Sequence, residues 1–214
     1  MFLFLGLVKL KNMANFKRKL NKKIIFIFVF VLILTVGGFF WWWQSREIKG
    51  TPDDYVIKET KEGVFVENKK AGLVVKVPEG WEVERMEVEE GLIVFNSQNI
   101  KGGLQNDKIT PPLENGCIIH ASVMYEKMDF TYLKLQAKYN LALLDVNSEE
   151  FEEIVINNYQ ALKIMADTQK IGPAIGIDIP HKDKTYSFLL IFAPDDKNNC
   201  LQEFESFLET VSIK

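Results

Sequence analysis

The sequence predicts an α+β fold, an antiparallel sheet of about six strands sandwiched by helices, preceded by a single N-terminal transmembrane helix. Three observations lead to this prediction: an uncharged segment near the N-terminus, short runs of β-branched and aromatic residues between turn formers, and two segments of helical periodicity. Short connections favour antiparallel pairing, because parallel strands need longer crossovers. Helices with one apolar stripe then lie against such a sheet.

The first element is the segment Ile24–Trp43, which contains no charged residue. A helix of this length is roughly 30 Å long and matches the hydrocarbon core of a bilayer. Small residues typical of a signal-peptide cleavage site do not follow the apolar core, so we expect an uncleaved membrane anchor. Basic and aromatic side chains favour the headgroup region. The residues expected at the two membrane interfaces are Lys22, Lys23, Trp41, Trp42 and Trp43.

The distribution of charge predicts the orientation of this anchor. Seven of the 26 basic residues precede Trp43 and all 29 acidic residues follow it, so the rest of the chain has 19 basic against 29 acidic residues. Basic residues beside a span stay on the cytoplasmic side. We therefore expect residues 1–23 to be a cytoplasmic leader, whether translation starts at Met1 or at Met13, and the C-terminal domain to be extracytoplasmic at the cell membrane. An acidic domain repels nucleic acid, so no nucleic-acid partner is expected.

The part beyond the anchor divides into a connector and one domain. Residues 44–70 form a charged connector with two short candidate strands, Tyr55–Lys58 and Val64–Glu67. Residues 71–214 have the usual length of one domain and can bury a sizeable core. Within it, short runs rich in β-branched or aromatic residues are expected to form strands. They are Leu73–Val77, Trp81–Met86, Leu92–Phe95, Cys117–Tyr125, Ile154–Asn157, Ala161–Asp167, Ile175–Ile179 and Thr185–Phe192, with hairpin turns at His181–Lys184 and Asn157–Tyr159.

Two segments have apolar residues at spacings of three and four, which is typical of amphipathic helices. The first follows Asp129, an expected N-cap, and the second begins near Asn199. The first stripe, on an otherwise polar helix, consists of Leu133, Ala137, Leu141 and Leu144; the second consists of Leu201, Phe204, Leu208 and Val211. We expect both stripes to lie against the sheet.

A resemblance to a known fold group rests on the strand Leu73–Val77 and the Pro-x-Gly-Trp turn Pro78–Trp81 that ends it. A second strand, a middle helix, several antiparallel strands and a closing helix follow. In this motif and this order of elements, the region Ala71–Ile213 resembles the PsbP and Mog1 fold group, which also includes DcrB and many membrane-anchored bacterial proteins. The resemblance implies the fold. Because members of the group differ in function, it implies no activity and assigns no functional residue to this chain.

Cys117 and Cys200 are the two cysteines of the chain, and both lie on the oxidising side of the membrane under the predicted topology. An even pair in such a compartment favours a disulfide bond, with two unpaired thiols as the alternative. A nucleophilic Cys117 acting with His120 or His181 is disfavoured. Residues three apart on a strand point to opposite faces, and His181 lies in an expected turn.

No motif for catalysis, cofactor binding or metal binding is found in the sequence. His-Glu-x-x-His, paired Cys-x-x-Cys, P-loop and Gly-x-Ser-x-Gly patterns do not occur. The acidic groups around Glu87–Glu90 and Glu149–Glu153 lack the ligand spacing of a calcium loop and are expected to be solvated. We therefore expect no catalytic residue, no cofactor and no metal.

These observations favour a noncatalytic, membrane-tethered extracytoplasmic module that binds or assembles components of the cell envelope, with an envelope protein as its partner. A cell-surface enzyme of unrecognised type, with a pocket around His120, is the alternative. A minor pilin-like subunit is a weaker alternative, because the apolar segment has no acidic residue near its start. The long connection Asn96–Gly116 is either a binding element or a mobile insertion.

Overall fold

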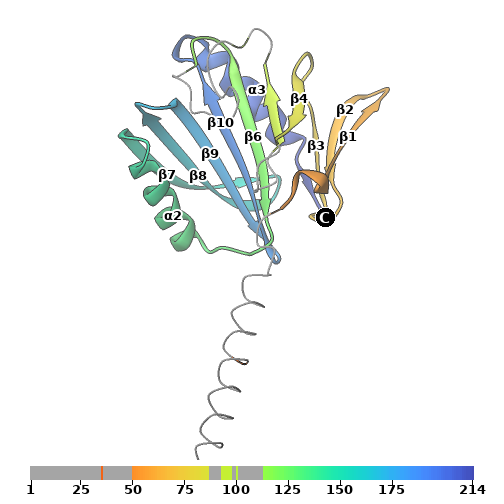
Figure 1. Cartoon of the computed structure of the whole chain (residues 1–214), viewed down its shortest axis with the longest axis horizontal. Coiled ribbons are helices and arrows are strands. Elements are labelled where there is room, and N and C mark those ends of the chain that lie inside the picture. The colour runs from red at the N-terminus through yellow and green to blue at the C-terminus, as the bar shows by residue number, and fades with distance from the viewer. Residues whose placement is uncertain (1–34, 36–49, 87–92, 98–99, 101–112) are drawn as a thin grey trace, which may run out of the picture. The chain divides into compact units, whose positions relative to one another are not determined.

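The computed structural model describes residues 50–86, 93–97 and 113–214, together with Thr35 and Ile100, and shows mostly antiparallel sheet with two α-helices (Figure 1). The expected leader, the expected anchor and its interface residues lie outside these described residues, apart from Thr35. No helix within the described ranges is long and apolar enough to cross a membrane. The compact unit that holds the two sheets runs from Glu47 to Lys214.

The smaller sheet has four strands and contains the segment that the sequence suggested as a connector. Its order is β1 (Tyr55–Thr60), β2 (Gly63–Asn68), β3 (Leu73–Lys76) and β11 (Ser212–Ile213). The two short strands expected in the connector are present, and β2 pairs directly with β3. The folded unit therefore begins earlier than the expected boundary at residue 71, because Tyr55 is fully buried in the main core.

The larger sheet has seven strands, against the six or so that were expected. Their order across the sheet is β4 (Glu82–Arg85), β5 (Ile93–Asn96), β6 (Cys117–Met124), β10 (Lys184–Phe192), β9 (Gly172–His181), β8 (Tyr159–Thr168) and β7 (Val146–Ile156), and all neighbours are antiparallel.

Tight turns join the last four strands of this sheet, as the sequence predicts. Lys182 and Asp183 connect β9 to β10, and Asn157 and Asn158 connect β7 to β8. Asn157, Asn158 and Lys182 have positive φ angles of 49°, 68° and 54°, which asparagine tolerates better than most residues. Strand β7 is longer than expected and includes the acidic stretch before Ile154. Acidic residues are depleted in strands, but here they lie exposed on an outer strand of the sheet.

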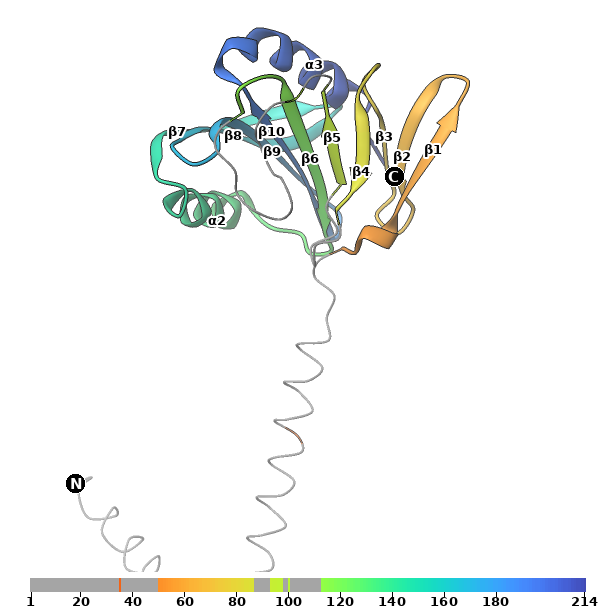
Figure 2. The same cartoon turned by 45° about the horizontal axis from the view of Figure 1, so that its top comes forward.

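The two helices lie on opposite sides of the seven-stranded sheet (Figure 2). Helix α3 (Lys197–Glu209) buries Phe204 and Phe207 against the main core, where Phe207 forms edge contacts with the rings of Phe95 and Phe188. The smaller sheet packs into the same core. The 3-10 turns η1 (Pro52–Asp54) and η2 (Pro194–Asp196) precede β1 and α3.

Helix α2 (Phe130–Ala142) begins after Asp129, whose carboxylate accepts a hydrogen bond from Tyr132 N at 2.8 Å, as expected for an N-cap. Leu133 is buried against Leu162 of β8 on the sheet face opposite α3. The expectation that the rest of this helix is polar is wrong. Its outer side carries exposed apolar side chains, namely Tyr132, Leu135, Tyr139 and, just after the helix, Leu143.

Candidate functional site

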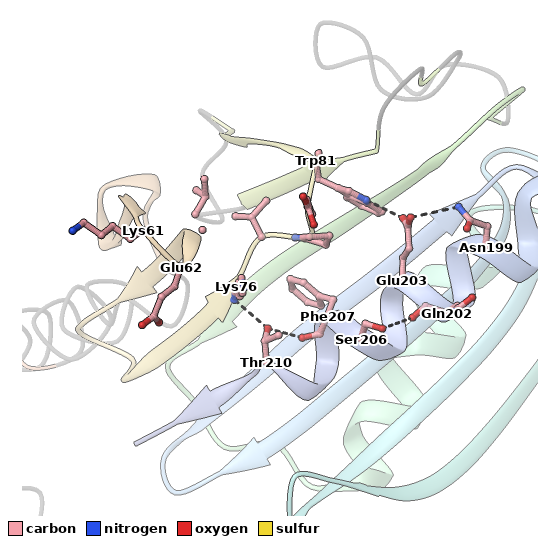
Figure 3. Close-up of a pocket in the computed structure, with 16 residues that line it drawn as sticks. Lys61, Glu62, Lys76, Trp81, Asn199, Gln202, Glu203, Ser206, Phe207 and Thr210 are labelled. Carbon is pink, nitrogen blue, oxygen red and sulfur yellow. Dashed lines mark hydrogen bonds between the residues drawn. The ribbon is translucent and has the colours of Figure 1, made fainter.

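A groove lies between α3 and the ends of β2 and β3 and is called the α3 groove below (Figure 3). Its volume is about 800 Å³. It is lined by Lys61, Glu62, Gly63, Val64, Lys76, Val77, Pro78, Glu79, Gly80, Trp81, Asn199, Gln202, Glu203, Ser206, Phe207 and Thr210. These residues come from two neighbouring segments, 61–64 and 76–81, and from the distant segment 199–210, so the groove exists only once the smaller sheet and α3 have assembled.

The turn that ends β3 positions one wall of the groove. Trp81 N donates to Pro78 O at 3.1 Å, and Gly80 has φ +80°. A β-turn with positive φ at its third residue favours glycine there, which explains the Pro-x-Gly-Trp motif. The turn delivers Trp81 to α3, where its indole Nε1 donates to Glu203 Oε2 at 2.9 Å. The Pro-x-Gly-Trp motif, on which the resemblance to the fold group rests, therefore has a structural role: it positions one wall of this groove.

The other end of the groove is fastened to α3 by Thr210. Backbone N of Lys76 donates to Thr210 Oγ1 at 3.0 Å, and that hydroxyl donates to Phe207 O at 2.7 Å (Figure 3). The Lys76 side chain then lies over Gly63, because a Cβ on Gly63 would be 2.9 Å from Lys76 Cε. Lys61 lies in the β1–β2 turn at the same end. No ion pair to Lys61 or Lys76 is found within the described ranges, so this end offers two ammonium groups beside the carboxylate of Glu62, which also lines it.

A smaller hollow of about 310 Å³ adjoins the groove and shares Glu79, Trp81, Asn199 and Glu203 with it. Asp196 also lines it, and its Oδ2 accepts a hydrogen bond from Gly116 N at 2.7 Å. Three carboxylates and no Lys or Arg line this end. The two adjoining hollows thus differ in charge: two lysines and Glu62 lie at the hairpin end, and three carboxylates without a lysine or arginine lie at the start of α3.

The groove presents hydrogen-bonding and charged groups, several of which already have partners within the fold. Ser206 Oγ donates to the backbone oxygen of Gln202 at 3.0 Å, so no base activates it, and the Glu203 carboxylate already accepts from Trp81. A nucleophile needs an adjacent base held by a third group, and the lining of the larger hollow has no His, Cys, Asp or Tyr. Apolar side chains such as Phe207 form its floor, with polar groups around it.

Cys117 and Cys200, the candidate disulfide pair, are covalently joined in the structure, with their Cα atoms 5.8 Å apart. The bond ties the start of β6 to the first turn of α3. Both residues also line the smaller hollow. Because Cys117 is bonded to Cys200, it is no nucleophile for His120 or His181.

His120 lies on the sheet face opposite the disulfide and lines neither hollow. The residue is 9% exposed, and its Nε2 has no hydrogen-bond partner among the described residues. Burial lowers the pKa of His120 to about 4, so the ring is neutral at pH 7. In the register, Ser122 is opposite Ser187, and Ser187 is opposite Asp178.

Asp178 is a half-buried titratable group on the same sheet face as His120. Ser187 Oγ donates to Asp178 Oδ1 at 2.5 Å. Burial raises the pKa of the Asp178 carboxyl, and the hydrogen bond from Ser187 offsets part of that rise. Across the described ranges, no three His, Cys, Asp or Glu side chains are grouped closely enough to hold a metal ion.

Sequence reasoning did not find the residues of the α3 groove. The sequence pattern of this helix pointed only to the apolar stripe Leu201, Phe204, Leu208 and Val211, none of which lines the groove. The usable signal was the Pro-x-Gly-Trp turn, since a tryptophan directly after a tight turn commonly packs against a neighbouring element. Glu203, its hydrogen-bond partner, is 122 residues away in the chain and carries no local signature.

No protein-family model and no curated protein sequence matches this chain. The structure is similar to that of cyanobacterial PsbP (CyanoP) from Synechocystis sp. PCC 6803, with 10% identity, a TM-score of 0.42, and 69% of this chain and 90% of that chain covered. It is similar to PA94 from Pseudomonas aeruginosa, described as a protein of unknown function, with 11% identity, a TM-score of 0.43, and 77% and 99% covered.

A third similar structure is a protein from Bacteroides thetaiotaomicron VPI-5482, with 12% identity, a TM-score of 0.39, and 67% of this chain and 45% of that chain covered. The cyanobacterial protein bears the name PsbP, which is also that of the fold group that the region Ala71–Ile213 resembles. The similarity concerns the fold alone, and no activity, ligand or partner of this chain follows from it.

Proposed function

We propose that this chain is a membrane-tethered, extracytoplasmic binding or assembly module of the cell envelope, without catalytic activity. We further propose that its α3 groove takes an extended segment of a partner protein. The observation that carries the proposal is the groove itself, which has an apolar floor, hydrogen-bonding groups around it and charged groups of opposite sign toward its two ends.

The dimensions of the groove support a peptide as its occupant. Asn199 and Thr210 are eleven residues apart along α3 and its C-terminal end, which corresponds to roughly 16 Å of helix axis. At about 3.3 Å per residue, roughly five residues of extended chain match this length. Ligand sites of this size commonly combine an apolar floor with a few polar groups that fix orientation.

The charges of the groove support a direction for that peptide. Its acidic end, with Glu79, Asp196 and Glu203, complements a lysine or arginine side chain of the partner. Its other end, with Lys61 and Lys76 against the single carboxylate of Glu62, has a net positive charge that complements a carboxylate. Complementary charges across an interface mainly set specificity and register, and they make association salt-dependent.

Site-specific photo-cross-linking in native membranes tests the groove. A benzophenone amino acid at Gln202, an exposed groove residue, is compared with one at Glu205, an exposed residue of the same helix that does not line the groove. We expect one discrete envelope protein linked from position 202 and not from 205. Identical products from both positions, or none from 202, would contradict the proposal.

Filling the groove is the complementary test. Ser206→Trp places an indole on the exposed groove side of α3, and Glu205→Trp is the matched control outside the groove. We expect Ser206→Trp to reduce recovery of the cross-linked partner at least tenfold at unchanged protease resistance of the chain. Undiminished recovery from this variant would show that the partner binds elsewhere.

The location is tested separately. With a peptide tag fused after Lys214, protease added to intact cells should remove the tag if the domain is extracytoplasmic. A tag that is digested only after the cells are opened would place the domain in the cytoplasm.

A cell-surface enzyme is the second candidate, and the unpartnered Nε2 of His120 is the observation that favours it. A neutral imidazole can accept a proton from a substrate that reaches it, although burial, which lowers the pKa of His120 to about 4, makes it a weak base at pH 7. Under our proposal, His120→Gln leaves partner cross-linking from position 202 unchanged. Loss of a surface hydrolytic activity of the purified full chain on this substitution, with the cross-link intact, would favour the enzyme.

A further inference from the structure

The outer side of α2 carries apolar side chains that nothing in the described ranges covers. Six large hydrophobic side chains of the described part are exposed, and four of them belong to this one helix and its end. Tyr132, Leu135, Tyr139 and Leu143, called the α2 stripe below, are between 52 and 69% exposed. Single exposed apolar residues are normal, but a continuous group marks an interaction surface.

The spacing of the α2 stripe aligns its members. At about 100° per residue, steps of three, four and four residues keep them within an arc of roughly 80°, over about 17 Å of helix axis. Leu133, which packs on β8, lies on the opposite side of the helix. Helix α2 therefore has two apolar stripes, and only the inner one is used by the fold.

The order of residues in the stripe is self-complementary. In an antiparallel pair of α2 helices related by a two-fold axis near position 137, Tyr132 faces Leu143 of the other copy. By the same symmetry Leu135 faces Tyr139, since both pairs have almost the same midpoint. Each ring thus meets a leucine, which alternates large and small side chains across the contact.

The charges on α2 do not oppose such a contact. Lys134 Nζ lies 2.9 Å from Glu153 Oε1, and Lys138 Nζ lies 4.0 Å from Glu149 Oε1. Lys138 also lies over the ring of Phe151, 5.5 Å from its centroid. Both lysines are therefore drawn toward β7 and away from the stripe. Uncharged Gln136 and Asn140 flank its other side.

The area of the stripe fits a weak contact between two copies. Large apolar side chains bury about 150–250 Å² each, so four that are little more than half exposed offer roughly 400–500 Å² per copy. A stable interface uses about 800 Å² per partner. We propose that the α2 stripe is the contact surface of a weak antiparallel dimer of this chain.

The test uses the full chain in lipid nanodiscs and in native membranes. A benzophenone amino acid at Leu135 should give a covalent homodimer, in which mass spectrometry finds α2 linked to α2 near Tyr139. The same amino acid at Val56, an exposed apolar residue of β1, is the matched control and should give no such link. The double substitution of Tyr132→Glu and Tyr139→Glu, both at exposed positions, should reduce the Leu135 link at least tenfold while protease resistance stays unchanged.

Three results would overturn the dimer. A link from position 135 to lipid would assign the stripe to the membrane surface, and a link to a different protein would assign it to a heterologous partner. A homodimer link that survives the double substitution would show that the copies meet through another surface. None of these results bears on the α3 groove, which lies on the other side of the seven-stranded sheet.

Discussion

Breaking the Cys117–Cys200 bond should lower the free energy of unfolding of the domain by about 4.5 kcal/mol. The two residues are separated by 83 positions. In the chain-entropy description, closing a loop of that length removes about 15 cal/mol/K from the unfolded chain, which is about 4.5 kcal/mol at 25 °C. Both residues are at most 1% exposed, so the bond lies within the core.

Pulse proteolysis of the full chain in detergent, over a urea series, measures this change without isolating the domain. At a urea dependence of roughly 2 kcal/mol per molar, the midpoint should fall by roughly 2 M. Wild-type protein is compared with and without reductant, and Cys117→Ala/Cys200→Ala is treated in the same two ways. The double variant should match reduced wild type in both conditions, apart from the small loss from removing two buried sulfur atoms.

The reasoning fails if reduced wild type unfolds within 1 kcal/mol of the oxidised protein while mass analysis shows that the bond has been broken. It also fails if unreduced peptides carry two free thiols, because the constraint would then not exist in the protein.

Three further predictions concern single residues. Between pH 6.5 and 4 the unfolded chain binds one more proton at His120 than the folded chain does. The free energy of unfolding should therefore fall by roughly 3 kcal/mol as the pH drops through this window. The urea midpoints of His120→Leu should lack this part of the pH dependence. Asn157 Nδ2 donates to Leu208 O and Val211 O at 2.9 and 3.0 Å. Asn157→Gly should therefore lower the free energy of unfolding in urea by about 1–2 kcal/mol. The control Asn158→Gly, at a residue whose φ has the same sign, should leave it nearly unchanged. Gly80→Ala forces an L residue to φ +80° and should lower the free energy of unfolding by about 1–2 kcal/mol. The control Gly176→Ala, whose Cβ would meet Ile164 at 3.6 Å, should change it by less than 1 kcal/mol. Equal losses of stability for the two variants would refute the explanation of the turn.

Local patterns gave the hairpins and the helix starts because each is determined by neighbouring residues. The β9–β10 turn at Lys182 and the cap at Asp129 depend on the residues beside them. Strand β7 was expected only from Ile154 onward, because four glutamates in a short stretch disfavour a strand. Pairing with β8 across its whole length overrides that preference, and the exposed position lets the carboxylates stay in water.

The candidate site could not be predicted because its parts are distant in sequence. Pairing of β2 with β3 brings Gly63 next to Lys76, and α3 approaches from residues 199–210. The spacing of apolar residues in the sequence does not indicate which helix covers which sheet. The outer stripe of α2 was overlooked for a different reason. A helix with apolar residues on two sides has no single apolar face, and only the inner of its two stripes was interpreted.

The acidic outer strand has a consequence for how copies of this chain coexist. Strand β7 is eleven residues long and, in the described part of the chain, pairs on one side only. A row of unbonded amides and carbonyls of that length is a template for sheet-to-sheet growth. Exposed acidic side chains along this strand, Glu150 and Glu152 among them, place like charges beside that free edge and so disfavour pairing of β7 with β7 of another copy.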